Sequence, residues 1–322
     1  MQVIQVSDRP ASQRFYAVAG RLLFIESFDR RLDDLIARLF AGWQLAPVAS
    51  IEREPDIRIN FFCDDARQQI PEGLNQFEIA DGGRCYTDGE DYYLSLGNLL
   101  MHLQNGRPVR VDLWLSELPD PVDSMFARAT SFAVCAGLRR FGLFELHSAG
   151  VVHPRSGKGL LIIGPSGSGK STLALRLAMA AWPYLSDDEL LLSSVNGEVE
   201  ARGFRTFFAV REELSSPSRT CFEPDVVLGS GRRTSASTGA LVFISLNGEQ
   251  KSELNRLTQA EAMARLLRSC PWATYDTGVA GAYLELLSRL ARQTNAFDLF
   301  AGRDLLAPSY ASQLLSHSVS LD

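Results

Sequence analysis

Eight consecutive residues in the second half of the chain have the types and spacing of a phosphate-binding loop. Residues 164–171 read Gly-Pro-Ser-Gly-Ser-Gly-Lys-Ser and match the pattern GxxxxGK[ST] in full. In such a loop, glycines let successive backbone N–H groups curl around an anion, and the following helix adds the dipole of its N-terminus. We predict that the phosphates of a nucleoside triphosphate are bound by Gly164, Pro165, Ser166, Gly167, Ser168, Gly169, Lys170, Ser171 and Thr172.

Two side chains of this loop have predicted roles in phosphate and metal binding. Lys170 is one of three lysines among 32 basic residues, so this chain places a flexible point charge here although it otherwise uses arginine. We expect the Lys170 ammonium to contact the β- and γ-phosphates of ATP. The hydroxyl of Ser171 is expected to complete the ligand shell of Mg²⁺.

Two adjacent carboxylates, Asp187 and Asp188, follow Lys170 by 17 and 18 residues. Successive residues of a strand point to opposite sides, so the two side chains can divide two tasks. One can hold Mg²⁺, and the other can accept the proton of an incoming hydroxyl group. The alternative for this pair is a solvated turn at a strand end.

The elements around these residues follow the order strand, loop, helix, strand, which is typical of an α/β domain. A hairpin turn is expected at 154–158 and another at Asn196-Gly197, while residues 230–239 have the composition of a polar loop. Strands are predicted at 151–152, 159–163, 184–186, 190–193, 198–202 and 240–246. Helices are predicted at 172–181, 259–268, 279–292 and 308–317.

The first part of the chain alternates strand-like and helix-like stretches. Strands are predicted at 21–26, 57–62, 92–96 and 109–115, with an amphipathic helix around residues 32–40. Pro119 and Pro121 mark a connector that leads into a long helix at 123–141. We therefore predict an N-terminal α/β domain for substrate recognition at 1–118, a connector and helix at 119–142, and a P-loop catalytic domain at 143–322.

The phosphate-binding loop followed by a double aspartate at this offset resembles the catalytic domain of the HPr kinase/phosphorylase family. The nucleotide site of that family is related to that of phosphoenolpyruvate carboxykinase. The likeness extends over residues 144–210 and includes His147 and the segment Val199–Gly203. It implies an α/β P-loop kinase fold with a smaller N-terminal α/β domain, and the use of ATP and Mg²⁺.

The resemblance also implies roles for individual residues. Asp187 would be the general base, and His147 would lie near the transferring phosphoryl group together with Lys170. Magnesium would be held by Ser171 and Asp188, with Glu200 as a further metal contact.

The chain departs from the family pattern in the segment after the double aspartate. Glu200 follows Asp188 by 12 positions, a shorter interval than in the family, so an exposed hairpin residue is its alternative role. Arg202, Arg232 and Arg233 are candidate contacts to substrate or phosphate, and a solvated loop is the alternative for the last two. The closer resemblance is to HPr-kinase-like enzymes of biosynthetic clusters, including kinases that phosphorylate a serine of a lasso-peptide precursor.

Composition excludes several other classes of protein. With 32 basic and 38 acidic residues the chain carries a formal charge of −6, which argues against nucleic acid or an anionic membrane surface as a partner. No apolar run reaches the ~18 residues that span a bilayer, and the first residues lack the pattern of a signal peptide. Five cysteines without a CxxC pair predict neither a disulfide framework nor a zinc site. We expect a cytoplasmic protein, with a homo-oligomer left open.

These observations favour a Mg²⁺-ATP-dependent kinase that acts on a serine or threonine hydroxyl of a protein or peptide. A small-molecule kinase of the same fold is one alternative. A nucleotide-binding ATPase or switch without a phosphoryl acceptor is another. Against that last alternative, the apolar strand predicted at 240–246 ends in Asn247-Gly248 and not in the acidic residue that such an ATPase places there.

Overall fold

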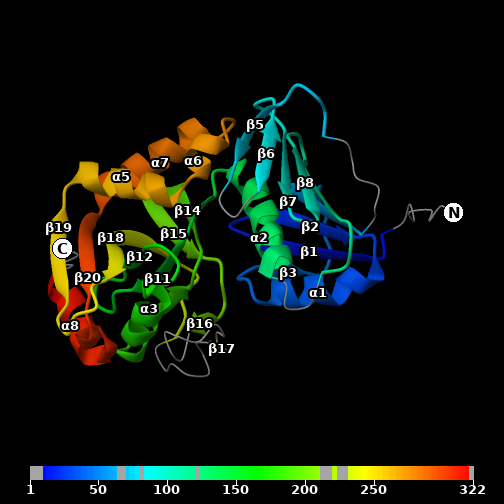
Figure 1. The fold of residues 1–322 in the computed structure, drawn as a ribbon. Helices are drawn as coiled ribbons and strands as arrows, with labels where there is room; N and C mark the ends of the chain where they lie inside the picture. The colour runs from blue at the N-terminus through cyan, green and yellow to red at the C-terminus, as the bar shows by residue number, and fades with distance from the viewer. Residues whose placement is uncertain are drawn as a thin grey trace. The chain divides into compact units, whose positions relative to one another are not determined.

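The computed structural model has a mixed α/β fold and divides into two compact units, which are described separately below (Figure 1). It describes residues 10–63, 70–79, 83–119, 124–210, 220–222 and 231–318. Unit 1 comprises Met1–Phe141 and the short segment Asp276–Gly278, and unit 2 comprises Gly142–Tyr275 and Val279–Asp322. In the predicted connector, Pro121 lies outside the described residues.

Unit 1 is built on a sheet that mixes parallel and antiparallel pairs. In the described residues the strand order is β3-β1-β2-β4-β9-β8-β7-β6-β5. Strands β2, β4 and β9 are parallel neighbours, whereas β9 to β5 form an antiparallel meander. The strands are β1 (Ser12–Val18), β2 (Arg21–Ser27), β3 (Ala46–Val48), β4 (Ile57–Cys63), β5 (Asn75–Glu78), β6 (Arg84–Thr87), β7 (Tyr92–Leu96), β8 (Leu99–Gln104) and β9 (Val109–Leu115).

The predicted strands and the two predicted helices of this region are confirmed. Helix α1 (Arg30–Ala41) begins after Asp29, whose carboxylate accepts from the Arg31 N–H, and it buries Leu32, Ile36 and Phe40 at the expected helical spacing. Helix α2 (Ser124–Arg139) contacts β4, β8 and β9. Sequence patterns missed β1, β3, β5, β6 and β8, because these strands are short or lack a clear alternation of apolar and polar residues.

Unit 2 contains a second mixed sheet that positions the predicted site. Its strand order in the described residues is β10-β14-β15-β18-β12-β11-β13, with β20 beside β18 and β19 beside β20. The strands are β10 (Phe144–Leu146), β11 (Ser148–Val152), β12 (Gly159–Ile163), β13 (Tyr184–Ser186), β14 (Leu190–Val195), β15 (Glu198–Gly203), β18 (Ser235–Leu246), β19 (Glu253–Leu257) and β20 (Asn295–Ala301). A separate pair joins β16 (Phe208–Val210) to β17 (Thr220–Phe222).

Helices lie against both faces of this sheet. They are α3 (Lys170–Met179), α5 (Gln259–Ser269), α6 (Trp272–Tyr275), α7 (Ala280–Gln293), the 3₁₀ turn η2 (Arg303–Leu306) and α8 (Pro308–Ser318). None of the helices in the described residues combines the length and apolar character needed to cross a membrane.

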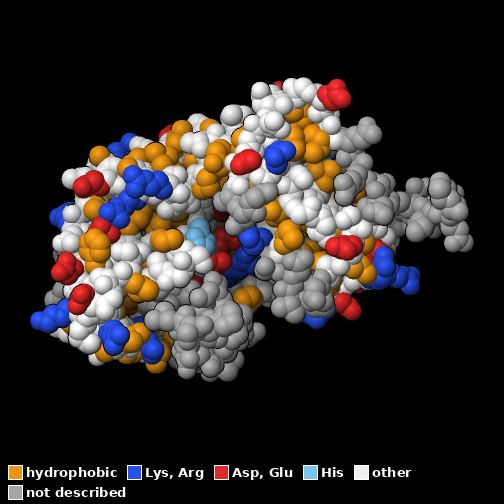
Figure 2. Space-filling view, viewed as in Figure 1, with side chains coloured by type: hydrophobic (Ala, Val, Ile, Leu, Met, Phe, Trp, Pro, Cys, Tyr) orange, Lys and Arg blue, Asp and Glu red, His pale blue; other side chains and the backbone are white. Residues whose placement is uncertain are grey.

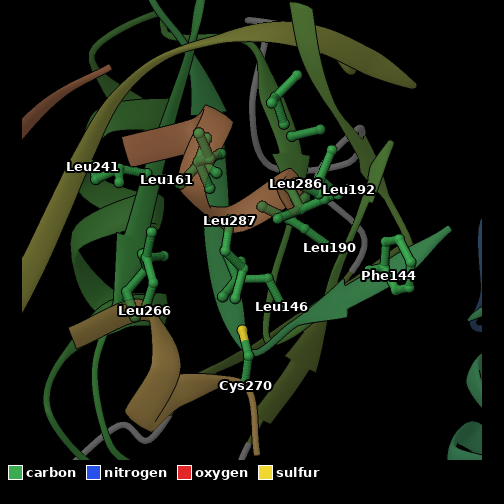
Figure 3. Packing of buried hydrophobic residues seen from close by; sticks show 14 of the residues in the cluster. Phe144, Leu146, Leu161, Leu190, Leu192, Leu241, Leu266, Cys270, Leu286 and Leu287 are labelled. Atoms are coloured by element: carbon green, nitrogen blue, oxygen red, sulfur yellow. The ribbon is translucent and has the colours of Figure 1, made fainter. Parts of the chain in front are cut away.

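The central strand β12 explains why both faces are covered. Its residues Leu161 and Ile163 join one hydrophobic cluster, which includes side chains of α5 and α7, whereas Leu160 and Ile162 join a second cluster with α3 and α8. Figure 3 shows part of the first cluster, where Leu161, Leu241 and Leu287 lie close together. A strand that is buried on both faces has a continuous apolar sequence, and Gly159–Ile163 (GLLII) is such a sequence.

The polar loop predicted at 230–239 is corrected by the structure. Residues 235–239 form the first part of the long strand β18. Ser235 and Ser237 pair with Arg202 and Glu200 of β15, and the Thr238 hydroxyl donates to the carbonyl of Val199. Alanine and glycine, which occupy positions 236 and 239, have low strand propensity, but here the pairing with β15 outweighs that preference.

Candidate functional site

The predicted phosphate-binding loop connects the end of β12 to the start of α3. Gly167 and Gly169 have φ angles of +82° and +96°, in the left-handed region that favours glycine. Gly164 is restricted by space, because a Cβ atom there would lie 2.6 Å from the Ile244 carbonyl oxygen and 2.6 Å from Oγ of Ser168. The three glycines therefore allow a tight loop between the sheet and the helix.

Lys170 lies at the first position of α3 and points back over the loop. Its Nζ donates to the carbonyl oxygens of Gly164 at 2.8 Å and Pro165 at 3.2 Å. A third contact of 2.9 Å joins Nζ to Nε2 of His147. The residue is only 6% exposed, so its charge is held inside the concavity of the loop.

His147 connects the loop lysine to the double aspartate. A lysine ammonium has no acceptor, so Nε2 of His147 accepts the bond from Lys170 and the ring proton is assigned to Nδ1. That Nδ1 atom lies 3.5 Å from Oδ1 of Asp188. Burial lowers the pKa of His147; the Asp188 carboxylate acts in the opposite direction, and the Lys170 ammonium lowers it further. The His147 side chain is partly exposed, at 46%. Figure 2 shows side chains of histidine, acidic and basic residues next to one another on one face of the molecule.

The two aspartates occupy different environments. Asp187 follows the end of β13 and is 1% exposed, whereas the side chain of Asp188 is 46% exposed. Between them the chain turns sharply, because Asp188 has a φ of +69° and the Glu189 N–H donates to the Asp187 carbonyl at 2.9 Å. The predicted division of the pair into two unlike carboxylates is consistent with this turn, while their individual roles stay predictions.

Sequence reasoning missed a residue that holds this turn in place. The hydroxyl of Ser186 donates to the Glu189 carbonyl at 2.7 Å and accepts from the N–H groups of Phe204 at 3.2 Å and Arg205 at 2.9 Å. Arg205 also pairs with the Glu189 carboxylate at 3.3 Å. The only signal in the sequence was a serine just before two aspartates, and the three partners of its hydroxyl become visible only in the folded chain.

Glu200 and Arg202 lie on the same face of β15 and pair with each other at 3.1 Å. Across the sheet, Glu200 is opposite Ser193 and Ser237. The contacts described for Glu200 therefore connect it to β14 and β18 and not to Lys170 or Asp188. Its role as a magnesium contact stays a prediction.

Arg232 and Arg233 lie beside the strand that leads to the double aspartate. The Arg233 N–H donates to the carbonyl of Tyr184 at 2.8 Å, and the Tyr184 N–H donates to Gly231 at 3.1 Å. Both arginine side chains are exposed. Their backbone is therefore attached to β13, three residues before Asp187, and their predicted contact with phosphate remains to be tested.

The residues of the loop fit a polyphosphate. Gly169 caps α3 without a side-chain hydrogen bond, so no cap side chain competes for the first amides of the helix. Oγ of Ser168 is buried and has no hydrogen-bond partner among the described residues. The hydroxyl of Ser171 and the carboxylate of Asp188 are oxygen ligands of the kind that Mg²⁺ prefers. Within the described residues, no three His, Cys, Asp or Glu side chains gather closely enough to form a metal centre by themselves.

Comparison with known proteins adds a loose structural likeness. No family model matches the chain, and a search of curated proteins finds no match in sequence. Among the solved structures that match is the HPr(Ser) kinase/phosphatase from Coxiella burnetii, with a TM-score of 0.32 and 11% sequence identity. The match covers 55% of this chain and 97% of that chain.

Proposed function

We propose that this chain is a Mg²⁺-ATP-dependent kinase that transfers a phosphoryl group to a serine or threonine hydroxyl of a protein or peptide. The proposal depends mainly on one observation, the contact chain from Lys170 through His147 to Asp188. These two contacts join the phosphate-binding loop to the acidic pair that follows it in the sequence. Asp188 is the direct neighbour of Asp187, the proposed general base, and direct transfer to a hydroxyl group requires the base to lie near the triphosphate.

The loop residues bind and orient the triphosphate in this proposal. Backbone N–H groups of residues 164–172 receive the phosphate oxygens, and Lys170 exchanges its contacts with the Gly164 and Pro165 carbonyls for contacts with phosphate. His147 accepts a further hydrogen bond from the lysine ammonium. Bound Mg²⁺ would neutralise developing charge on the phosphates, with Ser171, Asp188 and, as a further candidate, Glu200 as its protein ligands.

Asp187 is the proposed general base, and it accepts the proton of the attacking hydroxyl group. Its neighbour Asp188 is tied through His147 to the phosphate end of the site, which suits the metal side of the reaction. The acceptor proposed here is an HPr-like protein or a precursor peptide, recognised by residues 1–118, and Arg202, Arg232 and Arg233 are proposed contacts to substrate or phosphate.

The proposal is tested with Asp187→Asn and radiolabelled ATP, using a library of serine- and threonine-containing peptides as acceptors. Wild-type protein should label a subset of peptides, and Asp187→Asn should retain ATP binding but lose transfer by on the order of 10²-fold or more. Glu198→Gln, at an exposed position of β15, is the control and should transfer normally.

Two results would contradict this function. Labelling of a small metabolite and of no peptide would instead support a small-molecule kinase. ATP hydrolysis that is indifferent to every acceptor would instead support an ATPase or switch. Transfer by Asp187→Asn at the wild-type rate would leave the reaction class intact but show that the base is another group.

A further inference from the structure

Four strands of unit 2 end at the same edge of the sheet, and the phosphate-binding loop lies between two of them. Strand β12 is parallel to β18, and β18 is parallel to β20. Strand β11 is antiparallel to both β12 and β13, so β13 also runs parallel to β12. In open α/β sheets, ligands bind at the carboxyl ends of such strands. The loop therefore has β13 on one flank and β18 on the other.

The direction of a bound nucleotide follows from this order. His147 and Asp188 connect Lys170 to the end of β13, so the reacting end of a triphosphate belongs on that flank. A triphosphate is a linear chain with the nucleoside at its far end. The nucleoside is therefore directed towards the other flank, where β18 ends at Leu246.

Leu246 presents an apolar side chain at that position. It is 51% exposed, and its Cδ2 atom lies 3.4 Å from where a Cβ of Gly169 would be. A single exposed leucine is ordinary in a folded protein. This one lies beside Gly169, the glycine that precedes the helix of the phosphate-binding loop, and the flat face of a nucleobase requires an apolar surface of this kind.

Hydrogen bonds of Asn247 hold the turn that follows Leu246. The Asn247 side chain accepts from the Glu249 N–H at 2.8 Å and donates to the carbonyls of Lys251 at 3.0 Å and Phe300 at 3.3 Å. The Asn247 N–H also donates to the Ala301 carbonyl at 3.2 Å. These bonds attach the turn to β20, so a ligand that packs there would meet a surface that is already ordered.

The geometry points to a nucleobase subsite in which the side chain of Leu246 packs against the base of the bound nucleoside triphosphate, beside the turn 247–251. This inference rests on the nucleotide site of the proposed function and adds the residue that distinguishes a nucleotide from a bare polyphosphate. The buried Oγ of Ser168, which has no partner among the described residues, independently marks the adjoining loop as a place for a polar ligand.

Calorimetric titration of the full-length protein with ATP and with inorganic tripolyphosphate tests the subsite. Leu246→Ala should weaken ATP binding by about 5- to 15-fold and leave tripolyphosphate binding unchanged, because only ATP carries a base. Leu246→Met keeps the apolar surface and should bind ATP as the wild type does. The matched control is Met179→Ala, since Met179 is also 51% exposed but lies at the opposite end of α3.

Other results of these titrations would contradict the subsite, the proposed function or both. Equal weakening of both ligands in Leu246→Ala, or no change in either, overturns the subsite while the phosphate site stands. Wild-type protein that binds tripolyphosphate as tightly as ATP has the same consequence. Wild-type protein that binds neither ligand contradicts the proposed function, and the subsite with it.

Discussion

Nε2 of His147 accepts a hydrogen bond from Nζ of Lys170 across 2.9 Å, although the two residues are 23 positions apart in the chain. An imidazole nitrogen that accepts from an ammonium group carries no proton. Desolvation lowers the pKa of His147, and the Lys170 ammonium lowers it further against the opposing effect of the Asp188 carboxylate. The contact keeps the lysine charge over the loop, where phosphate would bind. Nδ1 of the same ring lies 3.5 Å from Oδ1 of Asp188, so a single side chain lies next to both the cation and the carboxylate.

Replacing His147 should separate this positioning role from simple packing. His147→Leu removes the acceptor for Lys170, and we expect phosphoryl transfer to fall by about 10- to 100-fold, the effect of losing one hydrogen bond to a charged group. His147→Gln supplies an amide oxygen and an N–H group and should retain activity within a few-fold. Steady-state kinetics of both variants, with ATP varied, would measure the loss. A leucine variant as active as the glutamine variant would contradict the role.

Gly164→Ala should disturb the loop through a steric clash. The new Cβ would lie 2.6 Å from both the Ile244 carbonyl oxygen and Ser168 Oγ, so the loop backbone must shift. We expect weaker binding of ATP and of tripolyphosphate together, and a destabilisation of about 1–3 kcal/mol. Gly281→Ala is the control, because nothing lies within 4 Å of its Cβ position in α7 and alanine favours a helix. Chemical denaturation and calorimetry measure the two effects, and an unchanged Gly164→Ala protein would show that the loop has more room.

The carboxylate of Asp276 should be a major contributor to the stability of unit 1. It pairs with Arg139 at 2.9 Å and Arg140 at 2.7 Å, and both the Arg139 and Asp276 side chains are at most 2% exposed. Asp276→Ala leaves buried positive charge without this carboxylate and should cost about 3–5 kcal/mol. Glu285→Ala breaks an exposed pair with Arg289 and should cost less than about 1 kcal/mol. Urea denaturation of both variants would compare them, and similar losses would contradict the prediction.

His102 should make the folded protein less stable as the pH falls. Burial lowers the pKa of His102, against the opposing effect of the Asp91 and Asp112 carboxylates. The unfolded chain takes up this proton near the ordinary value of 6.5, whereas the folded protein resists it. The contribution of neutral His102 to the free energy of unfolding is therefore fully present above pH 6.5, and it is lost as the pH falls through the lowered pKa of the folded protein.

The measurement is the free energy of unfolding of the wild type and of His102→Gln at pH about 7.5 and about 5.5. The wild type should lose more stability between the two conditions than the variant does. Other buried histidines act in the same direction, so only the difference between the two proteins reports on His102. Equal losses would show that this imidazole is protonated as readily in the folded state as in the unfolded chain.

The sequence by itself determined the elements whose signals are local. Glycine spacing and a following apolar period identified the loop at 164–171 and helix α3, because a tight turn needs residues without a Cβ and a helix repeats its contacts within a few residues. The strand β12 was visible for a similar reason, since a strand buried on both faces is apolar throughout. The double aspartate could be placed at the end of β13 by its position after that helix.

Tertiary structure alone decided which distant side chains meet. Three contacts join segments that are distant in the chain: His147 with Lys170, the Ser186 hydroxyl with the N–H groups of Phe204 and Arg205, and Leu246 beside Gly169. Pairing with β15 also turned the small polar residues 235–239 into a strand. Burial and hydrogen bonding over the whole sheet determine which strands pair. The residues that make such long-range contacts show no periodic pattern in the sequence that would predict them.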